Sequence, residues 1–183
     1  MKRKINLILI VLFVLSSILS AQTKNIQAVK KESSITYQLT HPLHEIESTS
    51  KETYCAIDVD LKSREIKKVS VQVDVTTFNS GNSNRDSHAM EVIDALSFPE
   101  ATFVSTSIVP KGNSLIVGGK LTFHGVTNDV TATAIPEWGN DKLVVHATMP
   151  ISLTAFKVER PSLLFIPVHD TLRFTLTAAF PLK

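Results

Sequence analysis

Apolar and polar residues alternate with a period of two along most of this chain. From Val69 to Val75 valines occupy every second position, and polar residues fill the positions between them. Apolar residues recur in the same way through the segments 115–123, 143–149 and 172–180. Because successive side chains of a β-strand point to opposite faces, this pattern predicts antiparallel strands with one face on a core and one face in solvent.

Further extended segments and the turns between them point to a closed β-fold. Strands are predicted at 34–39, 45–50, 54–61, 102–108 and 129–135, and turn-forming residues such as Gly112 and Gly139 separate the segments. About nine strands at this spacing indicate a sandwich or a barrel. Closure into a barrel would remove exposed sheet edges.

Only one stretch has helical periodicity. Met90, Ile93 and Leu96 lie three residues apart, which predicts a short helix over roughly 86–96, ending before Phe98 and Pro99. The sequence shows no second domain. We expect residues 22–32 to form a loose N-terminal lead-in and residues 33–183 to form one barrel domain.

The first 21 residues have the three parts of a secretory signal peptide. Lys2 to Lys4 form a positive start, Leu7 to Leu15 are apolar throughout, and Ser20 and Ala21 are small. A retained membrane anchor is the alternative, but a spanning helix needs roughly 20 apolar residues. We therefore predict cleavage after Ala21, a periplasmic or secreted protein, and no stable membrane insertion after cleavage.

Removal of the signal peptide changes the charge of the protein. The whole chain has a formal net charge of +2, and the segment 1–21 carries three cations and no anion, so the mature chain has a net charge of −1. No clustered basic face remains, which argues against nucleic-acid binding. Cys55 is the only cysteine, so no intrachain disulfide can form, and we expect its thiol to be buried on a strand.

The residues that could carry catalysis lack a catalytic arrangement. Six histidines are present, but none lies in a helical pair or in a histidine–glutamate motif that would hold zinc. No Gly-x-Ser-x-Gly elbow occurs, and Asp58 and Asp60 are expected on a solvated strand face. We predict no catalytic residue, no metal and no cofactor, and an enzyme is the weakest hypothesis.

Two segments carry more information. Asn82 to His88 opens the predicted helix, where Asp86 can cap free N–H groups and Arg85 can pair with a carboxylate or with carbonyls across a barrel mouth. Gly118 to Thr127 contains a turn at Gly125, next to which the His124 ring can hydrogen-bond across the turn. A helix cap and a hairpin explain both segments without any ligand.

Together these segments resemble the YceI-like family of exported lipid-binding barrels. The similarity rests on 84–88, on Phe98-Pro99, on 103–106 and on 119–127. It implies an all-β fold, an eight-stranded antiparallel lipocalin-like barrel, whose interior holds a polyisoprenoid or another long-chain lipid in the periplasm of a Gram-negative bacterium. The chain lacks the Asp-x-x-His-Ser opening and the Arg-x-x-Phe-Gly segment of many members, which places it in a shorter, divergent subgroup.

The candidate site residues follow from the barrel and from the resemblance. Apolar side chains that could line a lipid tunnel, or equally pack as ordinary core, are Phe103, Leu121, Phe123, Phe156, Leu164, Phe165, Phe174 and Leu176. Residues expected to order the barrel mouth are Asn84, Arg85, Asp86, His88 and His124. We also expect the apolar segment from Pro161 to Pro167 to form a lid over one barrel end.

Two functional hypotheses from different classes remain open. The first is a carrier for an isoprenoid-type or other long-chain lipid, without catalytic activity. The alternative is a filled barrel that acts as a structural or protein-interaction module in the periplasm. A homodimer is compatible with either. A continuous internal cavity favours the first hypothesis, and three imidazoles close to one point would revive a metal enzyme.

Overall fold

The computed structural model describes residues 23–183, and nearly all of its regular structure is β. Twelve strands are present in this part of the chain. The predicted signal peptide lies outside the described residues. The strands are β1 (Thr23–Gln27), β2 (Ser34–His41), β3 (His44–Ser50), β4 (Thr53–Asp60), β5 (Glu65–Asp74), β6 (Glu100–Lys111), β7 (Ser114–Phe123), β8 (Val126–Trp138), β9 (Lys142–Ser152), β10 (Ser162–Leu163), β11 (Ile166–Pro167) and β12 (Thr171–Pro181).

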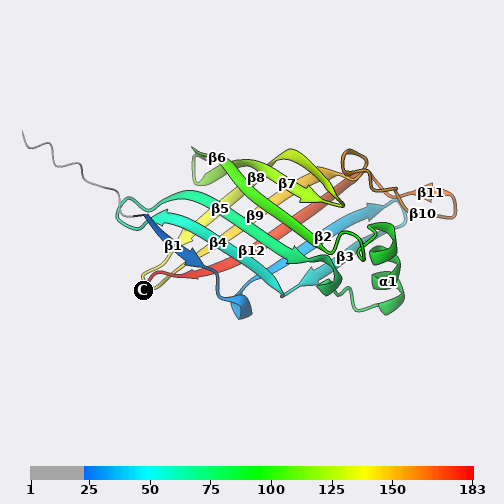
Figure 1. Ribbon diagram of the computed structural model, residues 1–183, viewed down its shortest axis with the longest axis horizontal. Helices are drawn as coiled ribbons and strands as arrows, with labels where there is room; N and C mark the ends of the chain where they lie inside the picture. Colours follow the sequence, from blue (N-terminus) through cyan, green and yellow to red (C-terminus); the bar gives the residue numbers. More distant parts are fainter. Residues whose placement is uncertain (1–22) are drawn as a thin grey trace, which may run out of the picture.

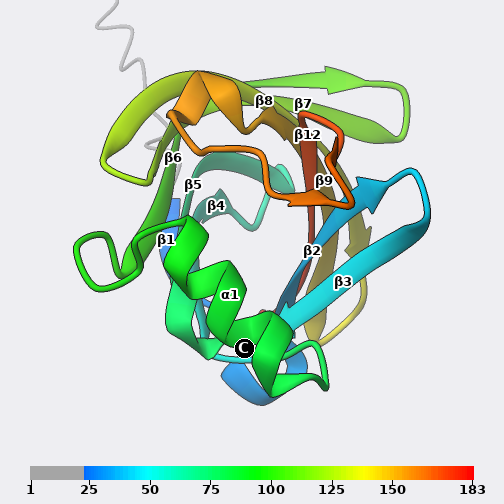
Figure 2. The same cartoon turned by 90° about the vertical axis from the view of Figure 1, so that its right-hand side faces the viewer.

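Ten of these strands form one antiparallel sheet in the order β1-β4-β5-β6-β7-β8-β9-β12-β2-β3. The sheet curls into a barrel, as the end-on view shows (Figure 2). The segment after β1 links the two sides of the sheet where the barrel closes, which we call the seam. The Ala28 N–H donates to the Cys55 carbonyl at 2.8 Å, and the Val29 N–H donates to the Ala179 carbonyl at 2.7 Å. β4 and β12 are thus connected through the chain that follows β1.

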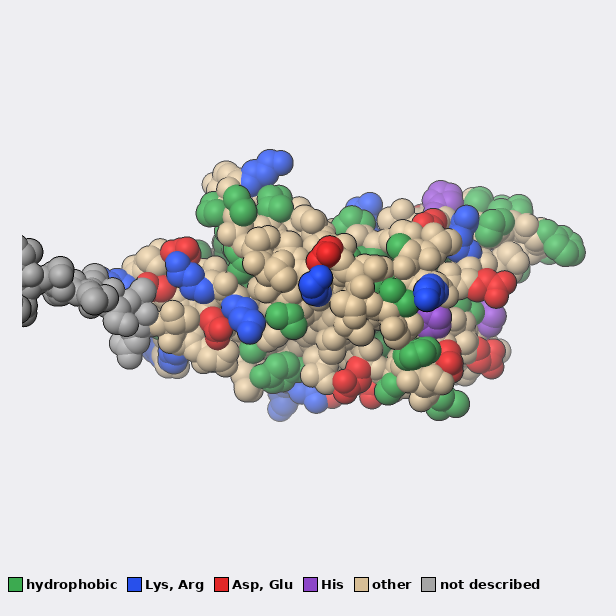
Figure 3. Space-filling view, turned by 45° about the horizontal axis from the view of Figure 1, so that its top comes forward, with side chains coloured by type: hydrophobic (Ala, Val, Ile, Leu, Met, Phe, Trp, Pro, Cys, Tyr) green, Lys and Arg blue, Asp and Glu red, His purple; other side chains and the backbone are tan. Residues whose placement is uncertain are grey.

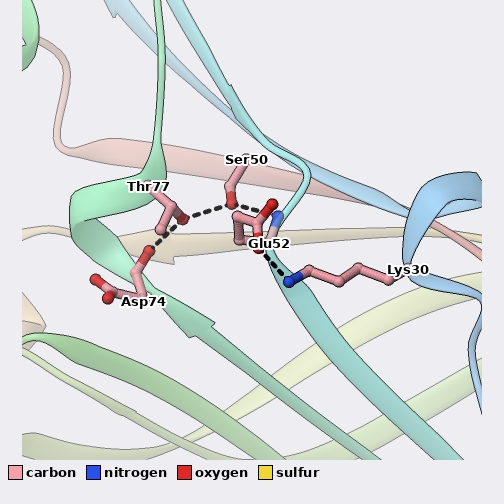
Figure 4. A network of polar contacts seen from close by, with 5 residues as sticks. All are labelled: Lys30, Ser50, Glu52, Asp74 and Thr77. Atoms are coloured by element: carbon pink, nitrogen blue, oxygen red, sulfur yellow. Dashed lines mark hydrogen bonds and ion pairs between the residues drawn. The ribbon is translucent and has the colours of Figure 1, made fainter.

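A polar network fastens the seam on its other side (Figure 4). Ser50, which is fully buried at the end of β3, shares a hydrogen bond of 2.6 Å with the hydroxyl of Thr77, and the Thr77 hydroxyl also contacts the Asp74 carbonyl at 2.6 Å. The Ser50 hydroxyl accepts the N–H of Glu52 at 3.1 Å, and the Glu52 carboxylate pairs with Lys30. The network links the short 3₁₀ helices Lys30–Glu32 and Val75–Thr77 to the β3–β4 connection.

The predicted antiparallel barrel is confirmed, but its strand count differs from eight. The main sheet has ten strands, and β10 and β11 form a separate small hairpin. One extra strand arises from the segment predicted as a loose lead-in, which is instead ordered as β1 and the 3₁₀ turn Lys30–Glu32. The reason is visible in Ile26, which is buried with the core while its strand pairs with β4.

The helix begins and ends earlier than the predicted 86–96. α1 spans Ser83–Val92, because the Asn82 side chain accepts the N–H groups of Asn84 and Arg85 at 3.1 Å each and so caps the helix in place of Asp86. The chain turns after Val92, and Leu96 is 98% exposed rather than on a buried helix face. None of the helices in residues 23–183 is both long and apolar enough to cross a membrane.

The connections divide between two barrel ends. At one end, here called the helix end, lie α1, the β7–β8 turn, the 3₁₀ turn Thr154–Phe156, the β10–β11 hairpin and the β2–β3 turn (Figure 1). The β4–β5, β6–β7 and β8–β9 turns and the C-terminus lie at the opposite end (Figure 1). Short turns close the opposite end, whereas the helix end carries the long connections.

Candidate functional site: an apolar interior under a helix

The barrel encloses an inner cavity with a volume of about 100 Å³. Every side chain on its wall is apolar, and β4 to β9, β12 and β2 all contribute. The predicted liners Phe103, Leu121, Phe174 and Leu176 are all on this wall. A cavity without polar partners holds water poorly but accepts apolar ligands.

An outer cavity of about 130 Å³ lies between the barrel and α1. Helix residues such as Arg85, His88 and Met90 form one side, and Leu39, Phe123 and other barrel residues form the rest. Three residues, Val73, Ala101 and Phe174, line both cavities. The two cavities therefore lie next to each other, with these three side chains forming part of both walls.

Of two further predicted liners, one lines the outer cavity and the other lines neither cavity. Phe123 faces the outer cavity, whereas Phe156 is 1% exposed and packs against the Phe123 ring at 5.9 Å between centroids without lining either cavity. Phe156 is the buried residue of the 3₁₀ turn after β9, at the helix end. Its role is core packing.

The prediction that Leu164 and Phe165 line the cavity is wrong. They form the turn of the β10–β11 hairpin, with φ of 51° and 65°, and are 73% and 100% exposed. The hairpin projects away from the barrel (Figure 1). The prediction that its apolar residues form a lid over the barrel end is therefore wrong. Only Pro161 from that segment reaches the outer cavity, and α1 covers it from the other side.

Arg85 and Asp86 hold the loop before the helix. The Arg85 guanidinium donates from Nε to the Ser80 hydroxyl and from Nη2 to the Ser80 carbonyl, both at 2.9 Å, and Asp86 accepts the Ser80 N–H at 3.1 and 3.2 Å. Arg85 thus binds a carbonyl, but one five residues away rather than across the mouth. Both side chains still border the outer cavity. The pair fixes the start of α1 against the preceding loop at Ser80.

The remaining mouth residues divide into one that borders the cavity and two that do not. His88 borders the outer cavity, and its Nδ1 lies 3.8 Å from the Glu91 carboxylate. Asn84 is exposed and lines neither cavity. His124 adopts a positive φ of 49° and its Nδ1 hydrogen-bonds the Phe156 carbonyl at 3.0 Å. His124 therefore braces the 3₁₀ turn after β9 rather than bonding across its own β7–β8 turn.

Phe98, in the segment that follows α1, packs against the β7–β8 turn. Its ring lies edge-on to the His124 ring, with the centroids 5.2 Å apart. Gly125 has a φ of 69°, and a Cβ there would lie 2.4 Å from the Phe98 ring. The segment that follows α1 and the β7–β8 turn thus meet at Phe98, which explains the need for glycine at position 125.

Tyr37 is the polar residue on the barrel wall that sequence reasoning missed. It borders the outer cavity, and burial raises the pKa of its hydroxyl above the usual value. Directly across the sheet lies the buried Ser48, whose hydroxyl partly offsets this rise in the pKa of Tyr37. The alternation of Ile35, Tyr37 and Leu39 along β2 could have placed Tyr37 inside.

The cysteine is buried in the barrel, and two of the histidines stack on each other. Cys55 lines the inner cavity, and burial raises the pKa of its thiol to about 12, which keeps it protonated. Its predicted burial is confirmed. His41 and His44 stack with ring centroids 5.0 Å apart, yet within residues 23–183 no three His, Cys, Asp or Glu side chains are grouped to hold a metal ion.

Comparison with known proteins gives the same architecture. Residues 27–180 match the family model described as YceI-like domain. The chain belongs to the YceI-like family. A UPF0312 protein of Vibrio parahaemolyticus is 38% identical over 108 residues, which cover 54% of this chain and 57% of that protein. The protein YceI of Salmonella arizonae is 32% identical over 107 residues, 54% of this chain and 56% of that protein. The match thus spans little more than half the length of these curated relatives.

Two solved structures of other bacterial proteins have the same fold. Burkholderia cenocepacia BcnA superposes with a TM-score of 0.76 at 22% identity, covering 83% of this chain and 98% of that one. A polyisoprenoid binding domain from Saccharophagus degradans superposes with a TM-score of 0.62 at 10% identity, covering 87% and 98%. At these identities the likeness concerns the fold alone. The match to the family model confirms the family resemblance drawn from the sequence.

Proposed function

We propose that this YceI-like protein is an exported carrier that holds a long-chain apolar lipid, of isoprenoid or fatty type, inside its barrel and catalyses no reaction on it. The observation that carries the proposal is the pair of abutting cavities, about 100 and 130 Å³, that share Val73, Ala101 and Phe174. A chain-like lipid needs a continuous apolar space with few polar groups. The polyisoprenoid binding domain of the same fold supports this class of ligand.

The distribution of polar groups suggests how the lipid lies. The inner cavity has only apolar walls, whereas Tyr37, Arg85, Asp86 and His88 border the outer one. Burying a polar group without a partner costs free energy, so a lipid with a polar end places its tail in the inner cavity and that end under α1. The signal-like N-terminus supports a periplasmic or secreted location.

The test is to express the full chain, purify the exported protein from the periplasm, and analyse its bound lipid by native mass spectrometry and organic extraction. Ala134 is buried on the inner wall, and Ala134→Phe fills that cavity. Ile135 is the next residue on β8 and is exposed, so Ile135→Phe is the matched control. We expect near-stoichiometric lipid in the wild type and the control, and at least about a tenfold loss in the cavity variant because the cavity volume is occupied.

Recovery of an undiminished lipid from Ala134→Phe would mean that the lipid sits elsewhere. A lipid-free wild type that takes up no added isoprenoid or fatty acid would overturn the proposal and leave the filled-barrel interpretation. Periplasmic recovery also tests the location, since retention of the chain in the cytoplasm contradicts export.

A further inference from the structure

The helix end carries a cluster of exposed apolar side chains that nothing in the proposed carrier function uses. It consists of Leu43 in the β2–β3 turn and of Leu163, Leu164, Phe165 and Ile166 in the β10–β11 hairpin, and we call it the apolar tip. Leu43, Leu164 and Phe165 are 61%, 73% and 100% exposed. The space-filling view shows apolar side chains gathered at this extremity of the molecule (Figure 3). Single exposed apolar residues are ordinary, but a contiguous group marks an interaction site.

His41 holds the two turns of the apolar tip together. It is 3% exposed, its Nδ1 accepts the Leu43 N–H at 3.1 Å, and its Nε2 lies 3.0 Å from the Ile166 carbonyl. Since Nδ1 accepts, Nε2 must carry the proton and donate to Ile166. The His169 N–H adds a bond of 2.8 Å to the Thr40 carbonyl. The apolar tip is therefore a built feature and not a loose loop.

The backbone of the hairpin turn is strained, and packing of its side chains does not offset the strain. Leu164 and Phe165 both have positive φ, which in a two-residue hairpin turn favours Asn-Gly or Asp-Gly. Their side chains do not contribute to the core. Strained backbone persists where function selects it, and here it presents two large apolar side chains to the outside.

Size and shape distinguish between possible occupants of the apolar tip. A stable protein interface needs about 800 Å² and 20–30 residues on each side, whereas this tip has five side chains on a narrow projection (Figure 1). A narrow apolar projection fits into the headgroup and acyl boundary of a bilayer. The neighbouring Lys157, Glu159, Arg160 and Glu45 have mixed charges, so apolar insertion and not attraction to anionic lipid would drive binding.

The apolar tip is also joined to the outer cavity. Pro161 precedes the hairpin and lines that cavity, and Leu39 and Ile46, from the strands that the β2–β3 turn connects, line it too. We propose that the apolar tip docks the helix end onto a lipid bilayer and so brings the outer cavity against the membrane for lipid exchange. The docking stands on the exposed tip alone, and its purpose rests on the proposed carrier function.

The experiment measures co-sedimentation of the purified protein with phosphatidylcholine vesicles, with and without phosphatidylglycerol. We expect binding that changes less than about threefold with phosphatidylglycerol or salt, because the neighbouring charges are mixed. Leu164→Ser/Phe165→Ser is expected to weaken binding at least about tenfold, since two large apolar side chains are lost. Val109→Ser is the matched control, because Val109 is 56% exposed on the β6–β7 hairpin at the opposite end and should have no effect.

A reporter variant locates the contact. In Phe165→Trp, the new tryptophan fluorescence should shift to the blue when vesicles are added and should be quenched by brominated phosphatidylcholine. In the wild type, the fluorescence of Trp138, on β8 near the opposite end, should not change when vesicles are added. Equal vesicle binding by the double-serine variant and the wild type overturns the docking proposal. So does tip-dependent dimerisation in sedimentation velocity without vesicle binding. Lipid retained in the double-serine variant shows that a docking failure is separate from a failure of the carrier function.

Discussion

At the scale of single residues, Gly119 shows how the cavity wall depends on the absence of a side chain. A Cβ at Gly119 would lie 2.5 Å from two carbons of the Phe103 ring and 2.6 Å from the Val104 carbonyl oxygen. Phe103 is a liner of the inner cavity on the neighbouring strand β6. The glycine thus lets a large ring lie flat against β7 while the interior stays open.

We therefore expect Gly119→Ala to destabilise the barrel by about 1–3 kcal/mol, because Phe103 or the backbone must shift. The free energy of unfolding in urea measures the effect. Gly118→Ala is the control on the same strand, since the added Cβ would meet mainly the Ser107 hydroxyl, the end of a side chain that can rotate. Equal losses in both variants would contradict a specific role for the Phe103 contact.

The sequence predicted some of these residues and not others for a physical reason. Alternation along a strand reports which side faces inward, so it placed Phe103, Leu121, Phe174 and Leu176 on the inner face of the barrel, where the structure has them. It does not apply in a turn, where backbone angles set side-chain direction. Leu164 and Phe165 were expected inside because they are apolar, but their positive φ values turn them outward.

At the scale of elements, the connection between β9 and β12 depends on one carboxylate. Asp170 accepts the Ser152 hydroxyl at 2.5 Å, the Thr154 N–H at 2.9 Å and the Thr154 hydroxyl at 3.1 Å. The Ser152 hydrogen bond, followed by those of Thr154, lowers the pKa of Asp170 below its usual value. The carboxylate fixes the 3₁₀ turn that carries Phe156 to the start of β12.

We expect Asp170→Asn to cost about 1 kcal/mol of unfolding free energy at neutral pH, through weaker hydrogen bonds. Because the folded-state pKa is depressed, the carboxylate stabilises the fold above the unfolded pKa of about 3.9, and this contribution disappears as pH falls through the lower folded value. The difference between wild type and variant should therefore shrink below about pH 4 in urea titrations. Asp129→Asn, which removes an exposed ion pair with Lys120, is the control and should cost little unfolding free energy at neutral pH. A pH-independent loss in Asp170→Asn would contradict the assignment.

Element boundaries were harder to predict than element types. The strands with clear alternation were all found, but the helix was placed three residues too late because Asn82, and not Asp86, satisfies its first N–H groups. β1 was missed because Ile26 is its one buried residue, and a single apolar position makes no alternating pattern. Such a short strand forms only because β4 provides a partner, and that pairing is not a local property of the sequence.

At the scale of the whole molecule, a barrel with a cavity forgoes part of the packing that would stabilise it. Side chains lining empty space lose the contacts that a partner atom would supply. The protein has no disulfide to offset this loss, because Cys55 is its only cysteine. A resident lipid would supply these missing contacts, which links the proposed function to the stability of the fold.

The stability of the barrel should therefore rise with lipid occupancy. A ligand that binds only the folded state at 100 times its Kd adds about 2.7 kcal/mol, and each kcal/mol raises the Tm of a protein of this size by about 2–4 °C. Delipidated protein should consequently melt several degrees below the lipid-loaded form in calorimetry, and readdition of the extracted lipid should restore the Tm. In Ala134→Phe the increment should vanish, because the added ring occupies the cavity and replaces part of the lost packing. An equal lipid-dependent increase in that variant would place the lipid outside the inner cavity.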